Sequence, residues 1–236
     1  KKALGDLPLR IVTGDIGILM AAVSGLKTTD RRKRALLRHI WRPKRFIATL
    51  EKFTNELSSS TERFDGFDEE TSFGNDVKEI GLRSKSEVIK RIENLLLDSK
   101  AAPISTIERG VINSLLNVGD KCPQALIKLK ALLPDMPALE SAIEKFERRL
   151  SALDKANVDL SVIDFEISYG RTSMEYYDGF VFGFYSENNI NLPPVATGGR
   201  YDALTKHIGK GREIPAVGGV VRPDLILQSK GFEDND

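Results

Sequence analysis

The stretch Gly198-Gly199-Arg200-Tyr201-Asp202 decides the fold class of this chain. It follows a loop at 191–197 and precedes a helical pattern of apolar residues at 204–208. Two consecutive glycines allow backbone conformations that a side chain would forbid, and they let a ligand approach the main chain closely. Arg200 and Tyr201 add a fixed cation and an amphipathic ring. The stretch therefore predicts either a site for a small polar ligand or an ordinary turn from a strand into a helix.

Two strands are predicted upstream of this stretch. Apolar side chains occupy every second position from Ile163 to Tyr169, and an aromatic-rich run at 179–185 alternates in the same way. A period of two is typical of strands with one polar face. We expect these two strands to form an antiparallel pair.

Helical periodicity dominates residues 28–157. The clearest pattern follows Pro137, with apolar residues at alternating steps of four and three: Leu139, Ile143, Phe146, Leu150 and Leu153. Shorter patterns run through 88–96 and 111–116, whereas 54–75 has no steady period and is predicted to be a surface loop. The long stripe is interpreted as core packing between helices.

The start of the chain predicts a strand at 9–12, a turn with a helix cap at 13–15, and then a helix. The predicted fold class is therefore α+β, an antiparallel sheet with a largely helical insertion. We assign residues 1–27 and 158–236 to the core domain and 28–157 to the insertion. Because residue 1 is not Met and the first strand follows so soon, we expect a longer polypeptide that continues on the N-terminal side.

The overall charge excludes a strong global attraction to nucleic acid or membranes, since 35 basic residues face 34 acidic ones. Locally, a helix that begins near Asp30 is expected to expose Arg31, Arg32, Lys33, Arg34 and Arg38. The basic stretch 31–45 suits a solvated or subunit-facing surface, with RNA binding as the alternative. Aromatic residues that would stack on bases are scarce there, with Trp41 alone inside the stretch.

Cysteine and histidine are too scarce to predict a cofactor or metal site. The single cysteine, Cys122, excludes an internal disulfide and is interpreted as structural. His39 and His207 have no ligand-type neighbours at metal-binding spacing and no partner for general base catalysis. No apolar run reaches the roughly 20 residues of a membrane span, so the prediction is a soluble, cytoplasmic protein.

Three segments together resemble the C-terminal part of the histidyl-tRNA synthetase core, a class II aminoacyl-tRNA synthetase. They are Tyr176-Tyr177-Asp178-Gly179, the glycine-pair stretch continued to Leu204, and Ile214-Pro215-Ala216-Val217-Gly218. The resemblance covers about 163–226, and 11–26 is more weakly similar to the same family. It implies a histidine pocket in which Arg171, Tyr177 and Tyr201 contact the ligand while Gly198 and Gly199 form the floor.

One departure from the synthetase pattern changes the implied function. The family opens a helix with Gly-Leu-Glu-Arg, and that arginine stacks on ATP; the corresponding residues here are Arg222-Pro223-Asp224-Leu225. Leu225 can neither stack as a guanidinium plane nor pair with phosphate. In addition, the spacing from Arg171 to Tyr176 is one residue longer than in the family. ATP-dependent activation of histidine is therefore expected to be absent.

A synthetase-like core without its ATP motif resembles the family of ATP phosphoribosyltransferase regulatory subunits. That resemblance implies a non-catalytic protein of histidine biosynthesis that assembles with catalytic phosphoribosyltransferase chains, supports their activity and takes part in feedback inhibition by histidine. It also implies self-association, because the family forms hetero-octamers. The alternative is a fragment of an active histidyl-tRNA synthetase, which ATP–pyrophosphate exchange would reveal.

Overall fold

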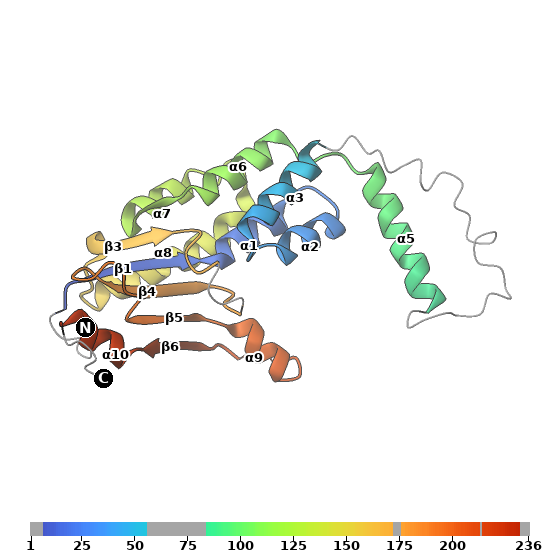
Figure 1. Ribbon diagram of the computed structural model, residues 1–236. Coiled ribbons are helices and arrows are strands. Elements are labelled where there is room, and N and C mark those ends of the chain that lie inside the picture. The colour runs from blue at the N-terminus through green and yellow to red at the C-terminus, as the bar shows by residue number, and fades with distance from the viewer. Residues whose placement is uncertain (1–6, 56–83, 172–175, 213, 232–236) are drawn as a thin grey trace.

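A computed structural model describes residues 7–55, 84–171, 176–212 and 214–231, and its centre is a six-stranded sheet (Figure 1). The strand order is β2-β3-β1-β4-β5-β6. The strands are β1 Leu9–Asp15, β2 Gly119–Lys121, β3 Ile163–Glu166, β4 Phe180–Ser186, β5 Ala196–Arg200 and β6 Val217–Val221. The helices are α1 Ile16–Gly25, α2 Asp30–Arg38, α3 Pro43–Asn55, α5 Lys85–Lys100, α6 Thr106–Leu116, α7 Cys122–Lys130, α8 Glu140–Lys155, α9 Asp202–Ile208 and α10 Pro223–Ser229. The predicted α+β class is confirmed.

The sheet is mostly antiparallel, but one predicted pairing is wrong. The strands expected as neighbours, β3 and β4, are separated by β1, which pairs with β3 in parallel and with β4 in antiparallel orientation. The pairs β2–β3, β4–β5 and β5–β6 are antiparallel. Alternation of side chains identifies the buried face of a strand but not its neighbour, so the insertion of β1 was invisible in the sequence.

The first strand runs directly into the first helix. Thr13 and Gly14 belong to β1, so the turn predicted at 13–15 is wrong, while the predicted helix cap is present at Asp15. The Asp15 carboxylate accepts a hydrogen bond from Gly17 N at 3.0 Å. Thr13 pairs with Phe165 in the parallel β1–β3 register, and its hydroxyl donates to Asp164 O at 2.9 Å. Strand and helix are therefore joined without a loop.

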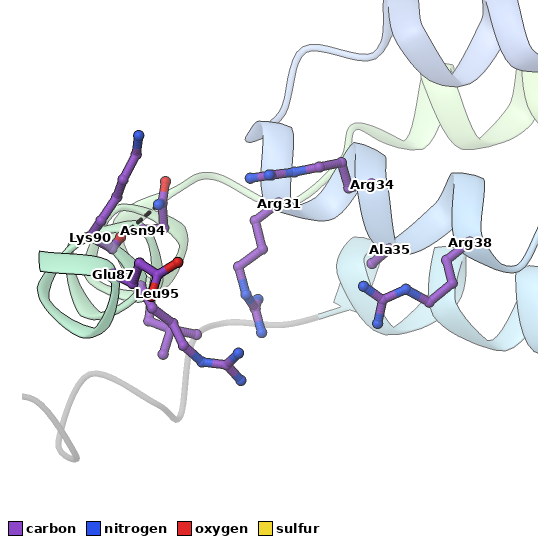
Figure 2. Close-up of a pocket in the computed structure, with 9 residues that line it drawn as sticks. Arg31, Arg34, Ala35, Arg38, Glu87, Lys90, Asn94 and Leu95 are labelled. Atoms are coloured by element: carbon purple, nitrogen blue, oxygen red, sulfur yellow. Dashed lines mark hydrogen bonds between the residues drawn. The ribbon is translucent and has the colours of Figure 1, made fainter. Parts of the chain in front are cut away.

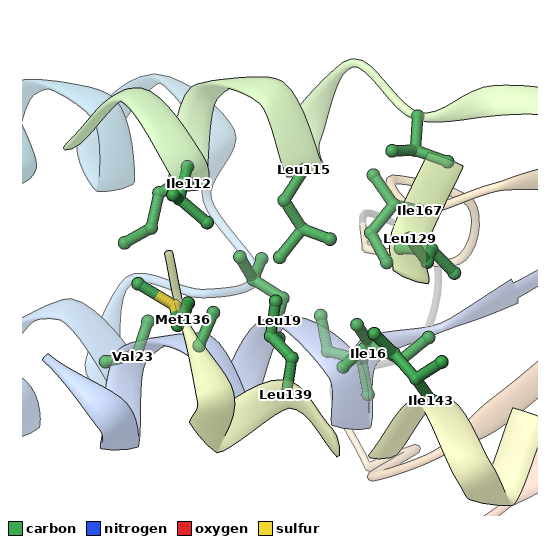
Figure 3. Packing of buried hydrophobic residues seen from close by; sticks show 14 of the residues in the cluster. Ile16, Leu19, Val23, Ile112, Leu115, Leu129, Met136, Leu139, Ile143 and Ile167 are labelled. Carbon is green, nitrogen blue, oxygen red and sulfur yellow. The ribbon is translucent and has the colours of Figure 1, made fainter. Parts of the chain in front are cut away.

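One apolar core connects the sheet with the helices that cover it (Figure 3). The predicted stripe on α8 is confirmed as core packing, since Ile143, Phe146 and Leu150 are buried. The Phe146 ring lies 4.6 Å, between centroids, from the Phe165 ring of β3. Helices α1, α6 and α7 contribute residues to the same cluster. The division into a core domain and a 28–157 insertion stays a prediction, because both parts share this core.

Other helical predictions are confirmed, with one helix missed. The patterns at 88–96 and 111–116 lie in α5 and α6, whose N-termini carry capping boxes at Ser84 and Ser105. Helix α3 was not predicted, and its end includes residues 54 and 55 of the expected loop. Residues 56–75 of that loop lie outside the described residues.

Helix α5 is held to the body through its C-terminal end. Arg32 of α2, expected on the surface, is buried with 1% of its area exposed. Its Nε lies 3.0 Å from Asp98 Oδ1, and its guanidinium donates to Ala102 O at 2.8 Å. Arg31 forms a second ion pair with Asp98. The exposure predicted for Arg32 is therefore wrong, because its hydrogen bonds with α5 and the following segment compensate for its desolvation.

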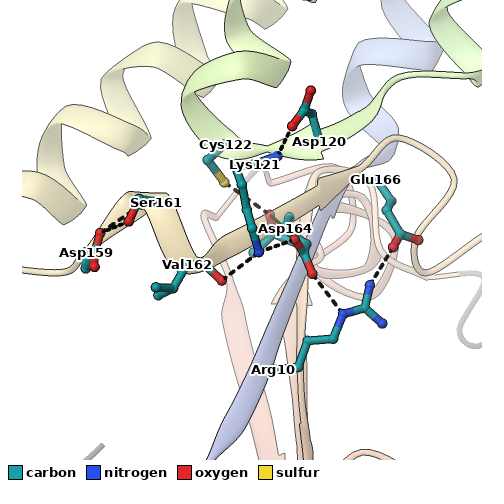
Figure 4. A network of polar contacts seen from close by, with 10 residues as sticks. Arg10, Asp120, Lys121, Cys122, Asp159, Ser161, Val162, Asp164 and Glu166 are labelled. Carbon is teal, nitrogen blue, oxygen red and sulfur yellow. Dashed lines mark hydrogen bonds and ion pairs between the residues drawn. The ribbon is translucent and has the colours of Figure 1, made fainter. Parts of the chain in front are cut away.

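A network of ion pairs joins the strands β1, β2 and β3 (Figure 4). Arg10 of β1 pairs with Asp164 at 2.8 Å and with Glu166 at 3.0 Å, and Lys121 of β2 pairs with Asp164 at 2.6 Å. Burial raises the pKa of the Asp164 carboxyl, but the hydrogen bonds from Lys121 and Arg10 outweigh it, so the pKa lies below its ordinary value. This network stabilises the charged form of Asp164.

The single cysteine begins α7 beside this network. Cys122 is buried, and its sulfur lies 3.8 Å from the Thr13 hydroxyl. Burial raises the pKa of the thiol, which disfavours the reactive thiolate. No helix within the described ranges is both long and apolar enough to cross a membrane.

Candidate functional site

A cavity of about 520 Å³ opens on the face of the sheet, with lining residues from β3, β4 and β5. Most of the lining comes from these strands and the turn after β3. The lining residues are Glu166, Ser168, Tyr169, Gly170, Tyr177, Val181, Phe182, Tyr185, Pro194, Thr197, Gly198 and Arg222. The volume lies within the range of small-molecule sites, roughly 300–1,000 Å³.

The glycine pair lies inside β5 and not in a turn, so the turn interpretation of these two residues is wrong. Neither Gly198 nor Gly199 has a positive φ. Each is required instead because an aromatic ring lies against it: a Cβ at Gly198 would be 2.5 Å from Phe182 Cζ, and a Cβ at Gly199 would be 2.7 Å from Tyr177 Cδ1. The close approach predicted for a ligand is thus made by the chain's own rings.

Three tyrosines from two segments meet beside the cavity. The ring centroids of Tyr176 and Tyr177 are 4.5 Å apart, and Tyr201 lies 6.3 Å from Tyr177. Tyr177 is buried and lines the cavity, whereas Tyr176 is 41% exposed. Burial raises the pKa of the Tyr177 phenol, and the hydrogen bond with Tyr176 raises it further. Tyr177 is therefore neutral at physiological pH, and its hydroxyl can form hydrogen bonds with a ligand in the cavity.

A second pair of phenols, Tyr169 and Tyr185, belongs to the lining of the same cavity. Tyr185 donates to the Tyr169 hydroxyl at 3.2 Å. Gly183 makes this possible, because a Cβ there would overlap the Tyr169 hydroxyl. Burial raises the pKa of Tyr169 as well. The Tyr169 phenol thus contributes a polar but uncharged group.

Arg222 is the cation of the cavity, and the sequence interpretation gave it no binding role. Its guanidinium donates to Pro194 O at 2.9 Å and to the Thr197 hydroxyl at 3.3 Å. Its main chain is fixed too, since Arg222 N donates to Val195 O at 2.9 Å. Glu166 supplies the carboxylate of the lining and is paired with Arg10. The lining of the cavity therefore combines one fixed cation, one carboxylate and three phenols.

Arg171 points away from this cavity. Its side chain is 2% exposed, its Nε donates to Ile40 O at 2.8 Å, and its guanidinium lies 5.3 Å from the centroid of the Phe46 ring. These contacts tie the turn after β3 to the segment between α2 and α3. Of the five residues expected in a histidine pocket, Tyr177 and Gly198 belong to the lining. Gly199 and Tyr201 contact Tyr177, and Arg171 belongs to the core.

The aspartates of the tyrosine-containing segments fix the backbone around the site. The Asp178 carboxylate accepts hydrogen bonds from Asp202 N, at 3.1 Å, and from Ala203 N at the start of α9. The Asp202 carboxylate accepts from Ala216 N at 2.8 Å. Burial raises the pKa of Asp202, but the Ala216 and Arg200 hydrogen bonds outweigh it and lower the pKa. Both aspartates thus hold main-chain N–H groups in place.

Leu225 lies in an apolar environment on α10. It is 9% exposed and forms a small cluster with Val195, against which Leu9, Phe184, Leu192 and Ile226 pack. A guanidinium at this position would lose these contacts and bury a charge. Within the described ranges, no three His, Cys, Asp or Glu side chains are grouped so that they could hold a metal ion.

The chain is similar to proteins of known family. The family described as Histidyl-tRNA synthetase matches residues 89–226. A protein of Agrobacterium fabrum named ATP phosphoribosyltransferase regulatory subunit is 31% identical over 157 residues, which cover 64% of this chain and 40% of that protein. A protein of the same name from Brucella ovis is 26% identical over 247 aligned positions, covering 96% of this chain and 64% of that protein. The chain thus spans less than two thirds of either relative.

Two solved structures share the fold. One, titled ATP phosphoribosyltransferase regulatory subunit/histidyl-tRNA synthetase and from Bacillus halodurans, has a TM-score of 0.58 at 18% identity and covers 97% of this chain and 46% of its own. The other, histidyl-tRNA synthetase from Nostoc, has a TM-score of 0.56 at 14% identity and covers 99% and 45%. At these identities the likeness is one of architecture, and it agrees with the predicted class II synthetase type of sheet.

Proposed function

Because the chain belongs to the histidyl-tRNA synthetase family, we propose that it acts in that family's non-catalytic branch, as a regulatory subunit of ATP phosphoribosyltransferase. This enzyme performs the first step of histidine biosynthesis in the cytoplasm. The names of the two relatives support the proposal. The observation that carries it is the apolar environment of Leu225, since the synthetase pattern needs an ATP-stacking arginine at this position.

The loss of aminoacylation is the first testable part. A leucine packed with Val195 offers no charge to a nucleotide phosphate and no planar cation to an adenine ring. Full-length protein is therefore expected to give no ATP–pyrophosphate exchange in the presence of histidine and Mg²⁺. An active histidyl-tRNA synthetase is the positive control. Robust exchange would refute the non-catalytic assignment and support the alternative, an active synthetase.

The partner is the second testable part. We expect the full-length protein to co-migrate with the catalytic phosphoribosyltransferase subunit in size-exclusion chromatography and to raise its activity. We also expect the complex, but not the catalytic subunit alone, to be inhibited by histidine. If the two proteins migrate separately and the activity is unchanged, the regulatory role is wrong.

We further propose that the cavity lined by β3, β4 and β5 binds histidine. Arg222 provides a cation for the ligand's carboxylate and Glu166 a carboxylate for its ammonium group, both in the lining. Opposite charges in these roles orient an amino acid in one direction. Tyr177 and Gly198 form part of the wall, and Gly199 and Tyr201 keep the Tyr177 ring in position. Arg171, buried against Phe46, acts only through the fold.

Calorimetry with histidine tests this site. Arg222→Gln keeps a polar side chain but removes the charge, so the affinity is expected to fall at least about tenfold, or 1.4 kcal/mol. Arg212→Gln is the matched control, since Arg212 is exposed and does not line the cavity. Equal affinities for the wild-type protein and Arg222→Gln would refute histidine binding in this cavity without affecting the partner assignment.

A further inference from the structure

A second hollow, between α2 and α5, shares no residue with the cavity on the sheet. Figure 2 shows it with α2 on one side and α5 on the other. It encloses about 510 Å³ and is lined by Arg31, Arg34, Ala35, Arg38, Glu87, Lys90, Arg91, Asn94 and Leu95. We refer to these nine residues as the arginine hollow.

The arginine hollow concentrates positive charge. Five of its lining residues are Arg or Lys, and Glu87 is the one carboxylate among them. Glu87 is already engaged, because it accepts a hydrogen bond from Ser84 N at 2.9 Å in the cap of α5. Asp98 pairs with Arg31 from outside the lining, and counting both carboxylates still leaves an excess of three cations (5 − 2). The whole chain has an excess of only one.

Several of these side chains form no ion pair with a carboxylate among the described residues. Arg38, Lys90 and Arg91 are exposed, and the described residues offer them no ion pair. In Figure 2 the side chains of Arg34 and Arg38 extend from α2 toward α5. Like charges that line one hollow repel each other, and a bound anion would reduce this repulsion.

The scaffold that carries these side chains is anchored. Arg32, one residue from the hollow, is buried and binds Asp98 and Ala102, which fixes the end of α5 against α2. Arg34 Nε donates to Asp30 O at 3.2 Å, which restrains the stem of that side chain. The two rows of cations are therefore presented from two helices that are joined at one end.

The chemistry of the lining selects the ligand. Guanidinium groups bind phosphate oxygens through paired N–H donors, and several of them suit an anion with more than one phosphate. The apolar part of the lining consists of Ala35 and Leu95, with no aromatic residue on which a nucleic-acid base would stack. We propose that the arginine hollow binds a small polyphosphate, such as the linked phosphates of a nucleoside di- or triphosphate. The assignment is independent of the catalytic partner.

Isothermal titration of the full-length protein with inorganic tripolyphosphate, at low ionic strength in a phosphate-free buffer, tests the proposal. The double variant Arg38→Gln and Arg91→Gln is expected to weaken binding at least about tenfold, which corresponds to 1.4 kcal/mol. Neither residue is buried, so the fold is retained, as circular dichroism would verify. Arg148→Gln on α8 is the matched control, a 67% exposed arginine outside the hollow, and its affinity is expected to equal that of the wild type.

Two kinds of result would overturn the proposal. One is the absence of binding heat for the wild-type protein, or an equal loss of affinity in the double variant and in the Arg148 control. The other is an RNA hairpin that binds in an Arg38- and Arg91-dependent manner and is not displaced by tripolyphosphate, since that result assigns the hollow to nucleic acid. Co-migration with the catalytic subunit is a separate measurement, so failure here leaves the proposed function standing.

Discussion

Replacing Gly198 by alanine is expected to destabilise the protein by about 1–3 kcal/mol, the usual cost of forcing an extra methyl group into a packed site. The added Cβ would lie 2.5 Å from Phe182 Cζ, and closer still to Gly218 O. Carbon atoms in contact are normally about 3.5–4.0 Å apart. The Phe182 ring can rotate away, but Gly218 O belongs to β6, which pairs with β5 at Gly218 and Gly199. Relief therefore requires a shift of the sheet.

Urea unfolding measures this cost. With a slope of about 2 kcal/mol/M, a loss of 2 kcal/mol moves the unfolding midpoint down by roughly 1 M. The matched control is Gly110→Ala on α6, where an added Cβ has no heavy atom within 4 Å. In a helix this change is expected to raise the stability by about 0.5–1 kcal/mol.

The two alanine substitutions are therefore expected to change the free energy of unfolding in opposite directions. A Gly198→Ala protein with the midpoint of the wild type would refute the argument that β5 and β6 leave no room for a side chain at this position. The same variant is expected to weaken histidine binding in calorimetry, because Gly198 lines the cavity next to the displaced Phe182 ring. Wild-type affinity in a destabilised variant would separate the packing argument from the binding proposal.

Three further predictions concern stability. Phe146→Ala removes the ring that packs 4.6 Å from Phe165 and is expected to cost about 3–5 kcal/mol in urea unfolding. Asp98→Asn leaves the buried Arg32 guanidinium without its counter-charge and is expected to cost about 3–5 kcal/mol, with wild-type stability as the contradicting result. Asp164 has a lowered pKa, so its stabilising effect is present above its unfolded pKa of about 3.9 and is lost as the pH falls through the lower folded value. Asp164→Asn is accordingly expected to lower the urea midpoint at pH 7, and the difference from the wild type should shrink at pH 3.

Much of the fold was predictable because periodicity reports directly on burial. The α8 stripe and the alternation in β3 gave the correct element types. Helix α3 could have been found in the same way, since Phe46, Leu50 and Phe53 recur at steps of four and three and all are buried. Strand order was beyond reach, because the position of β1 between β3 and β4 is decided by contacts between segments more than 140 residues apart.

The burial of charged side chains is the feature that sequence patterns predict least well. Arg32 and its neighbour Arg31 are indistinguishable in a basic run, yet Arg32 is 1% exposed and Arg31 is exposed. The difference arises because Arg32 faces the carbonyl groups of Asp98 and Ala102. The sequence pattern also failed to predict where the Arg171 side chain lies. Arg171 precedes the paired tyrosines as in the family, but its hydrogen bond with Ile40 O directs it into the core.

The candidate site depends on a short segment whose two ends face different surroundings. Arg222 lies before α10, its N–H donates to Val195 O just before β5, and its guanidinium binds the Thr197 hydroxyl in the cavity. Leu225, three residues on, faces Val195 and the apolar cluster. Pro223 begins the helix between them, and its fixed φ prevents the two side chains from exchanging places by a small backbone rotation. A cation in the cavity and an apolar residue at position 225 are therefore consequences of one local conformation, which suits the proposed binding of an amino acid without its activation.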